Sequence, residues 1–302
     1  MKENKSQIAL IAAILVIAAI IAYVCYGIIK SSGKDEAGNI KFGKNPIATM
    51  DVKYTDKDGN EKTGTIKMEL YPDVAPISVA NFVGLANNGF YDGLTFHRIM
   101  SDFMIQGGDP EGDGSGTVKI SKLDKSIEEG SSKDHNYSIK GEFAANGIYN
   151  SLKFQKGVVG MARADYSNMG YTEEGYNSGS SQFFIVTSDK DTTLSNLNQI
   201  YASFGKVIEG YDVVEEIANV EVTESDSGEK SKPTNAPVIT SVKVDTFGAN
   251  YGVPETINYD EIKSKITQYQ DYMNQIYSSS NVETGVDNSE EAPVEYTEAV
   301  NE

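Results

Sequence analysis

Alternation of polar and apolar residues dominates the middle of the chain and predicts β-strands there. The runs ATMDVKYT and KTGTIKMEL flank the turn sequence DKDGN, so residues 48–70 are predicted to form a β-hairpin. Further strand-like runs follow at residues 95–106, 157–162, 181–187, 201–208 and 237–245. Many short strands in succession predict a mainly β domain, closed or nearly closed into a barrel.

Helical periodicity interrupts the strands twice. Residues 75–91, APISVANFVGLANNGFY, repeat apolar side chains at helical spacing, with Ser78 as a possible N-terminal cap. Residues 210–220, GYDVVEEIANV, show the same spacing over a shorter stretch. The pattern therefore predicts two helices that cap the barrel.

A different pattern begins after Val244, where apolar residues recur every three or four positions. Asn258 followed by Glu261 is typical of a capping box at a helix start. The apolar stripe favours a helix packed on its own domain, and a coiled-coil or partner surface is the alternative. We assign residues 246–280 to this helical segment. Residues 281–302 carry acids and no Lys or Arg, which predicts a disordered tail.

The amino-terminal part carries an uncharged apolar run at residues 8–29, after a short tail of residues 1–7. Its length suits a helix that crosses a membrane once, although a cleaved signal peptide would share these features. The following Gly-, Ser- and Lys-rich residues 30–45 predict a flexible linker. More lysines follow the run than precede it, and counted literally this favours a large domain on the inner side of the membrane. We nevertheless expect the large domain, residues 46–245, outside the membrane, because long domains translocate largely regardless of charge and a domain without cysteine suits an oxidising exterior.

Charge and rare residues exclude several classes of function. The 302 residues include 44 Asp and Glu against 26 Lys and Arg, a formal charge of −18 that disfavours nucleic acid as a partner. The only cysteine, Cys25, lies in the apolar run, and there are two histidines. Thiolate nucleophiles, zinc sites and hydrolase triads are therefore unexpected. Residues 109–120 begin like a calcium loop but end in Ile120 where a bidentate Glu is needed. We expect no metal or cofactor.

The stretch FHRIMSDFMIQGGD, residues 96–109, places one permanent cation, Arg98, among apolar side chains. A site with a fixed donor, apolar walls and no nucleophile suits rotation about an X–Pro bond, which breaks no covalent bond. In the twisted transition state the prolyl nitrogen gains a lone pair, to which a guanidinium can donate without losing its charge. The hypothesis requires that Arg98 face an apolar cleft that has room for a peptide, and that no acidic neighbour lock it away.

Four motifs in this order, FHRIMSDFMIQGGD, GVVGMARA, SGSSQFFIVT and FGKVIEG, resemble those of the cyclophilin family of peptidyl-prolyl isomerases. The resemblance covers about residues 46–245. It implies an eight-stranded antiparallel β-barrel closed by two helices, with the substrate groove on the outside face. It also implies proline-containing polypeptides as partners.

Matching the motifs position by position implies roles for individual residues. Arg98 would be the catalytic donor, with Phe103 and Gln106 beside it. His97 would be a structural histidine, hydrogen-bonded beneath the site. The residues implied to bind substrate are Met104, Gly114, Ala162, Arg163, Gln182, Phe184, Leu197 and Tyr201. The sequence departs from the family pattern at Arg163, usually asparagine, and at Asn196, where several members carry the tryptophan associated with cyclosporin binding.

These features predict a membrane-tethered prolyl isomerase that assists the folding of exported or surface proteins. A non-catalytic module that binds or scaffolds proline-containing segments is the alternative, and the 259–277 helix is a candidate surface for a protein partner. Two polar inserts, residues 122–138 and 165–179, are predicted to be surface loops. The second lies between two groove motifs, so its tyrosines would either extend the binding surface or form a solvated excursion.

Overall fold

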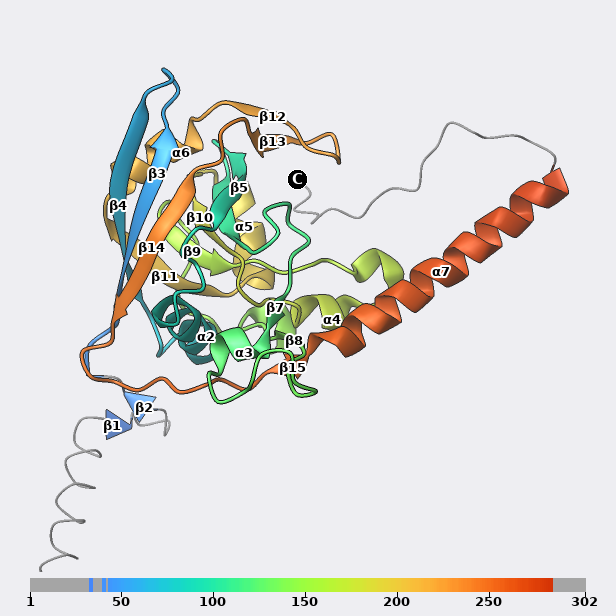
Figure 1. The fold of residues 1–302 in the computed structure, drawn as a ribbon, viewed down its shortest axis with the longest axis horizontal. Coiled ribbons are helices and arrows are strands. Elements are labelled where there is room, and N and C mark those ends of the chain that lie inside the picture. Colours follow the sequence, from blue (N-terminus) through green and yellow to red (C-terminus); the bar gives the residue numbers. More distant parts are fainter. Residues whose placement is uncertain (1–32, 35–39, 42, 285–302) are drawn as a thin grey trace, which may run out of the picture. The chain divides into compact units, whose positions relative to one another are not determined.

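A computed structural model describes residues 33–34, 40–41 and 43–284 (Figure 1). The chain divides into two compact units, residues 1–45 and 46–302. In the first unit, β1 (Gly33–Lys34) pairs with β2 (Ile40–Lys41) in an antiparallel manner. None of the helices in the described part is long and apolar enough to cross a membrane. The predicted anchor at residues 8–29 lies outside the described residues.

The second unit is built on a closed barrel of eight strands, as predicted. Around the barrel the order is β10-β6-β5-β14-β3-β4-β11-β9, and every neighbouring pair is antiparallel. The strands are β3 (Ile47–Thr55), β4 (Glu61–Leu70), β5 (Thr95–Met100), β6 (Met104–Asp109), β9 (Val158–Met161), β10 (Phe183–Val186), β11 (Ser203–Glu209) and β14 (Val238–Asp245).

Alternation along the strands sends one set of side chains into the barrel. In the hairpin of β3 and β4, Ala48 lies opposite Met68 and Met50 opposite Ile66, and all four are fully buried. The pattern that predicted the hairpin therefore also selects its register, because a slip of one residue would turn these side chains to solvent.

Two helices, α2 (Pro76–Asn87) and α6 (Tyr211–Ala218), pack against the barrel as predicted. Ser78 does not cap α2, because it lies inside the helix. Glu142, from a distant segment, accepts hydrogen bonds from the backbone N–H groups of Ile77 and Ser78 at 2.9 and 2.8 Å. A carboxylate is favourable at a helix N-terminus. Ser78 therefore lies in the first turn of the predicted helix, but the side chain that caps this helix is Glu142.

Several elements were not predicted. A helix, α5 (Asp191–Ile200), precedes β11, and a hairpin of β12 (Val222–Glu224) and β13 (Lys230–Pro233) follows α6. The two inserts hold short elements rather than plain loops. These are α3 (Ile120–Leu123), β8 (Asn136–Ser138), the 3-10 helix η2 (Ser167–Met169) and α4 (Thr172–Tyr176). The other small elements are β7 (Val118–Lys119), η1 (Ala144–Asn146) and β15 (Ile257–Asn258), and β15, β8 and β7 form one small sheet.

The last helix, α7 (Tyr259–Thr284), begins where the capping signal predicted, with the Asn258 side chain accepting a bond from the N–H of Asp260. It continues to Thr284, four residues into the segment predicted to be a disordered tail. Its first turns pack on the 165–179 insert, whereas Tyr272, Ile276 and Tyr277 are exposed. The first half of the apolar stripe thus serves the chain's own domain. The candidate partner surface on residues 259–277 stays a prediction.

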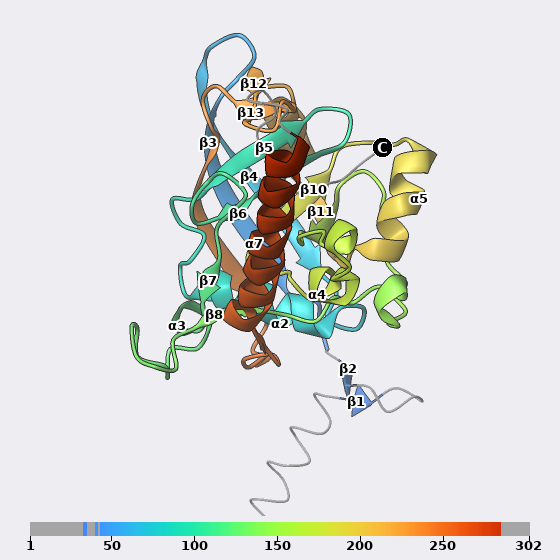
Figure 2. The same cartoon turned by 90° about the vertical axis from the view of Figure 1, so that its right-hand side faces the viewer.

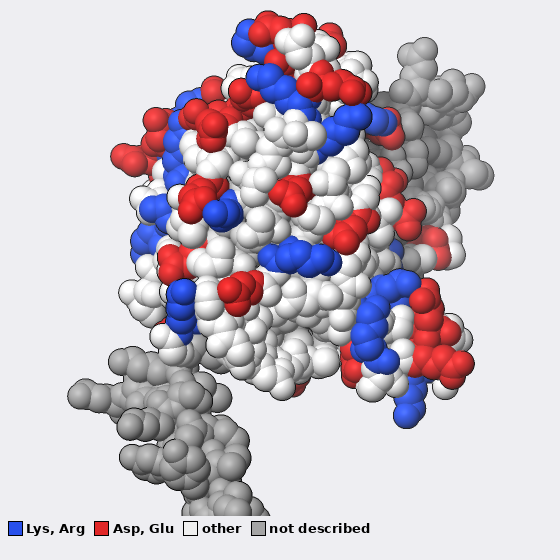
Figure 3. All heavy atoms as spheres, turned by 60° about the vertical axis from the view of Figure 1, so that its left-hand side comes forward, with Lys and Arg blue, Asp and Glu red and all other residues white. Residues whose placement is uncertain are grey.

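Charged side chains of both signs are interspersed on the face of the molecule in Figure 3. That face carries no continuous basic patch of the kind that binds a phosphate backbone.

Candidate functional site

A β-bulge places Arg98 on the outside of the barrel. The pairing of β5 with β6 shifts register between Phe96 and Arg98, so that Phe96 lies opposite Gly107 while Arg98 lies opposite Gln106. Phe96 enters the core, and Arg98 stands on the outer face beside the Gln106 side chain. An extra residue in one strand re-aims the side chains that follow it, which is a common use of bulges near active sites.

The Arg98 guanidinium is held by an acidic partner, Glu229, which lies in the turn before β13. Two bonds of 2.7 Å join the pair, from Nε to one carboxylate oxygen and from Nη2 to the other. The third nitrogen, Nη1, donates to Oε1 of Gln106 at 3.3 Å. Hydrogen bonding with Arg98 lowers the pKa of the Glu229 carboxyl, so the pair is ionised at neutral pH. The Arg98 side chain is only 12% exposed.

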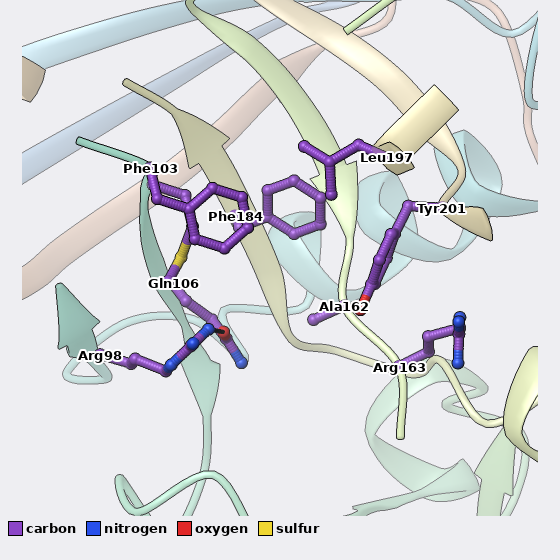
Figure 4. A pocket seen from close by; sticks show the side chains of 9 residues that line it. Arg98, Phe103, Gln106, Ala162, Arg163, Phe184, Leu197 and Tyr201 are labelled. Carbon is purple, nitrogen blue, oxygen red and sulfur yellow. Dashed lines mark hydrogen bonds between the residues drawn. The ribbon is translucent and has the colours of Figure 1, made fainter. Parts of the chain in front are cut away.

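The hypothesis of an unhindered cation is therefore corrected in one respect, because Arg98 does have an acidic neighbour. Glu229 binds the Nε–Nη2 edge, and the Nη1 end stays on the side of Gln106 and the pocket. Figure 4 shows Arg98 and Gln106 side by side at the pocket margin. A bidentate carboxylate fixes the plane of a guanidinium, and it also reduces the positive potential around it.

Two glutamine amides extend this polar edge. Gln106 donates to Oε1 of Gln182 at 2.9 Å, and Gln182 donates to the backbone oxygen of Gly114 at 2.9 Å. The predicted residues Arg98, Gln106, Gln182 and Gly114 thus form one chain of hydrogen bonds. Both amides are nearly buried, so their orientations are set by this chain.

Opposite the polar edge lies a small apolar pocket. Its cavity volume is about 10 Å³. The Phe184 ring meets the Tyr201 ring edge to face at 5.5 Å (Figure 4). The Phe184 ring also stacks on Phe154 at 5.6 Å. The lining residues are Arg98, Phe103, Met104, Gln106, Ala162, Arg163, Phe184, Leu197 and Tyr201. Nine of the eleven residues predicted from sequence therefore line one pocket, and Gly114 and Gln182 adjoin it through the hydrogen-bonded chain.

Gly160 on β9 makes room for the pocket floor. It lies opposite Phe184, and a Cβ atom built there would overlap the Phe184 ring and come within 2.8 Å of Phe154. Only glycine lets both rings take these positions. Sequence reasoning missed this residue, although it lies within the GVVGMARA motif.

Arg163 has its guanidinium engaged beneath the pocket wall. Nε donates to the backbone oxygen of Ile200 and Nη1 to that of Ala164, each at 2.8 Å. The same group lies 4.9 Å from the Tyr201 ring centroid and 5.2 Å from that of Tyr176. Arg163 lines the pocket, and its charge stabilises the wall.

His97 was expected to be hydrogen-bonded below the site. It is buried, but neither ring nitrogen has a hydrogen-bond partner among the described residues. Burial lowers the pKa of the imidazole, so the ring is favoured in its neutral form.

Glu229 is the second functional residue that sequence reasoning missed. The sequence SDSG, residues 225–228, is a turn signal that could have predicted the hairpin. No local pattern could have shown that this hairpin lies against β5, more than a hundred residues earlier in the chain.

The arrangement offers a held cation, two oriented amides and an apolar hollow. In the described part of the chain no group of three or more His, Cys, Asp or Glu side chains is placed to hold a metal ion. The hollow is apolar and small, and a charged donor lies at its rim. The Arg98 guanidinium is therefore placed to donate a hydrogen bond to a neutral lone pair on a ring bound at the hollow.

Comparison with known proteins agrees with this site. Residues 51–244 match the model of the cyclophilin-type peptidyl-prolyl cis-trans isomerase family. Peptidyl-prolyl cis-trans isomerase B of Bacillus subtilis is 37% identical over 166 residues, which cover 55% of this chain and 89% of that protein. A Staphylococcus haemolyticus protein, named as a candidate peptidyl-prolyl cis-trans isomerase, is 35% identical over 207 residues, covering 60% of this chain and 87% of its own.

Proposed function

The chain belongs to the cyclophilin-type peptidyl-prolyl cis-trans isomerases, and from this premise we propose that Arg98 catalyses the rotation of X–Pro bonds in client polypeptides. The chain has the activity of this family, which is peptidyl-prolyl cis-trans isomerisation. The observation that carries the assignment to Arg98 is its place at the rim of the apolar pocket, beside Gln106.

The barrier to rotation is about 20 kcal/mol and comes from amide resonance. When the bond is twisted, the prolyl nitrogen becomes pyramidal and can accept a hydrogen bond. The planar ground state offers no such acceptor. A donor at the pocket rim therefore stabilises the transition state more than the bound substrate, which is the condition for catalysis.

The magnitudes show that Arg98 does not act alone. A rate gain of about 10⁵ needs roughly 7 kcal/mol. One charged hydrogen bond contributes about 1.5–3 kcal/mol net. Removal of water from an apolar site strengthens such a bond. The remainder must come from holding the peptide on both sides of the proline, a task for the Gln106 and Gln182 amides and for the backbone at Ala162.

We further propose that the domain acts outside a membrane to which residues 8–29 anchor it, and that its clients are exported or surface proteins. The support is the length and lack of charge of that run in the sequence. A full-length chain expressed in a bacterial host should sediment with membranes, and external protease should degrade the domain in intact spheroplasts. A domain protected from protease in spheroplasts and degraded only after lysis would contradict this location.

The catalytic assignment is tested on the full-length chain in mild detergent, with a short proline peptide and NMR exchange as the readout. Arg98→Ala should lower kcat by about 10²-fold, since it removes a transition-state donor and leaves Glu229 without its partner. Arg98→Lys should remain well below wild type, because an ammonium cannot hold both carboxylate oxygens and also reach Gln106. Equal rates for Arg98→Ala and wild type would refute the assignment. A wild-type chain that binds the peptide but does not accelerate exchange would favour a binding module.

A further inference from the structure

Arg163 contacts two aromatic rings, one that lines the proline pocket and one that does not. Its guanidinium lies 4.9 Å from the ring centroid of Tyr201, which lines the pocket, and 5.2 Å from that of Tyr176, which does not. Arg163 and Tyr201 are both buried, so water is largely excluded from their contact. Figure 4 shows these two side chains at the end of the pocket opposite Arg98.

Arg163 also fixes the backbone next to Tyr201. Its Nε donates to the backbone oxygen of Ile200, the residue before Tyr201, at 2.8 Å. The Tyr201 ring in turn meets the ring of Phe184 at the pocket floor. A shift of Arg163 would therefore move the pocket wall relative to the floor. Because the cavity volume is only about 10 Å³, even a small displacement changes the contacts that a bound ring can make.

Tyr176 is the last residue of α4, in the second of the two inserts. Its ring meets Phe143 edge to face at 5.3 Å, and Phe143 belongs to the buried core of the domain. The insert is also tied to the segment that follows β9, because the N–H of Ala164 donates to Oγ of Ser178 at 2.8 Å. Tyr176 therefore holds a fixed position beside Arg163.

The C-terminal helix α7 supports α4 as well. The ring of Tyr269 in α7 meets that of Tyr171, the residue before α4, edge to face at 5.9 Å. Lys265 of α7 lies 3.2 Å from Glu174 in α4. Figure 2 shows α7 running beside α4 in front of the barrel. Two parts of the chain outside the barrel, the insert and α7, thus hold the element that carries Tyr176.

The chemistry of the guanidinium explains why Arg163 needs an aromatic neighbour. Its N–H groups donate in the plane of the group, to the backbone oxygens of Ile200 and Ala164. The faces of that plane cannot form hydrogen bonds, and they stack on aromatic rings. A ring also attracts the cation, most strongly where water is excluded. Loss of the Tyr176 ring would therefore remove part of what offsets the cost of burying this charge.

We infer that Tyr176 is a positioning residue for the isomerase reaction: acting through Arg163, it holds Tyr201 in place as a wall of the proline pocket. The inference rests on the proposed function, because it takes the apolar pocket as the proline site. The wall contacts the proline ring in the planar and in the twisted state alike, whereas the Arg98 donor acts on the twisted state. Loss of Tyr176 should therefore weaken substrate binding and leave the chemical step unchanged.

The test separates KM from kcat for a short proline peptide, by NMR exchange on the full-length chain in mild detergent. Tyr176→Leu keeps an apolar side chain against Phe143 but removes the aromatic face. It should raise KM about fivefold and leave kcat within about twofold of wild type. A fivefold change corresponds to about 1 kcal/mol, the size expected for one desolvated cation–π contact. Tyr176→Phe keeps the ring and should retain the wild-type KM.

A double-mutant cycle shows whether the effect passes through Arg163. In the Arg163→Met background, Tyr176→Leu should change KM by less than about 1.5-fold, because the residue that transmits the effect is already absent. Tyr149→Leu is the matched control. Tyr149 also lies near a cation, 5.9 Å from Nζ of Lys153, but it is 81% exposed and does not line the pocket. This control should keep the wild-type KM.

The inference is overturned if Tyr176→Leu has the wild-type KM, or if it raises KM to the same extent in the Arg163→Met background. A wild-type chain that does not accelerate the peptide would instead count against the proposed function. In that case, fluorescence anisotropy with the labelled peptide still decides about Tyr176. Tyr176→Leu should bind the peptide about fivefold more weakly than wild type and Tyr176→Phe do, and equal affinities would refute the inference.

Discussion

Glu229 binds the catalytic candidate Arg98 through two bonds of 2.7 Å, and the Nη1 end of the same guanidinium donates to Gln106. The carboxylate and the amide together fix the guanidinium plane at the pocket rim. A flexible arginine would need to be ordered during each catalytic cycle, at a cost in side-chain entropy. Glu229 has thus already ordered the donor, although its negative charge weakens the potential of the guanidinium.

Substitution of Glu229 tests whether kcat depends more on the ordering of the Arg98 guanidinium or on its positive potential. We expect Glu229→Ala to lower kcat about tenfold, because a donor that is no longer held spends less time in the productive geometry. Glu229→Gln keeps the shape and one acceptor oxygen, so its kcat should stay within about threefold of wild type. The measurement is NMR exchange of a short proline peptide. A rate for Glu229→Ala above that of wild type would show that the charge matters more than the orientation.

Acid should break the same pair. Hydrogen bonding with Arg98 lowers the pKa of Glu229 below its ordinary value of 4.5. The ion pair therefore contributes fully above that ordinary value, and its contribution is lost as pH falls through the lowered pKa. Wild-type kcat should be flat across neutral pH and decline only in that acid range, in parallel with a loss of stability. In Glu229→Gln this acid decline should be absent or smaller, and an identical profile in both proteins would contradict the prediction.

Gly160 controls the shape of the pocket floor. Gly160→Ala would place a methyl group against the Phe184 and Phe154 rings, and overpacking of this kind costs about 1–3 kcal/mol. Because the displaced ring is Phe184, we expect KM for a proline peptide to rise about tenfold together with a lower Tm. Gly205→Ala is the matched control, since its Cβ would meet Leu70 inside the barrel. It should lower Tm and leave KM unchanged, and a similar change in KM for both variants would contradict this role of Gly160.

The attachment of α7 depends on a small cluster of side chains that includes Ile266, Ile262 and Met169. Removing buried methyl groups, as in Ile266→Ala, costs about 2–5 kcal/mol at well-packed sites. This cluster is separate from the barrel core, so we expect α7 to detach while the barrel remains folded. Hydrogen exchange should show protection lost in α7 and kept in β3 and β4. With Gln268→Ala as an exposed control, an equal loss of protection throughout the barrel would contradict this independence.

Much of the fold could be predicted from the spacing of apolar residues and from capping residues, because both act locally along the chain. Alternation in β3 and β4 fixes both the hairpin and its buried face, and the Asn258 signal gives the start of α7 correctly. The spacing of apolar residues did not predict an element that buries few apolar side chains. In α5 only Leu197 is buried, so its ten residues show no apolar stripe of the usual width.

The candidate site was predictable to the extent that its residues lie in contiguous motifs. Arg98, Phe103 and Gln106 share one stretch of sequence, and a single bulged strand pair brings them together. Glu229 belongs to a hairpin whose position depends on tertiary packing. Its pairing with Arg98 therefore could not be read from local sequence. Ser78 shows the same limit, since the partner of the α2 N-terminus is the distant Glu142.

Glu142 itself offers a test of how burial and hydrogen bonding compete at a helix N-terminus. The carboxylate accepts bonds from the N–H groups of Ile77 and Ser78 and from the Ser78 hydroxyl at 2.6 Å. These bonds favour the charged form, yet burial outweighs them and raises the pKa of Glu142. The folded state therefore binds this proton more tightly than the unfolded state does.

The sign of the pH dependence follows from that raised pKa. Between the ordinary value of 4.5 and the raised one, the folded state holds more protons, so the contribution of Glu142 to the free energy of unfolding falls as pH rises. Glu142→Gln cannot titrate, and its stability relative to wild type should therefore increase across that window. At low pH it should be less stable than wild type by about 1–3 kcal/mol, because an amide leaves one of the helix N–H groups poorly satisfied. Urea unfolding of both proteins at a series of pH values measures the difference, and a difference independent of pH would show that Glu142 titrates as it does in the unfolded chain.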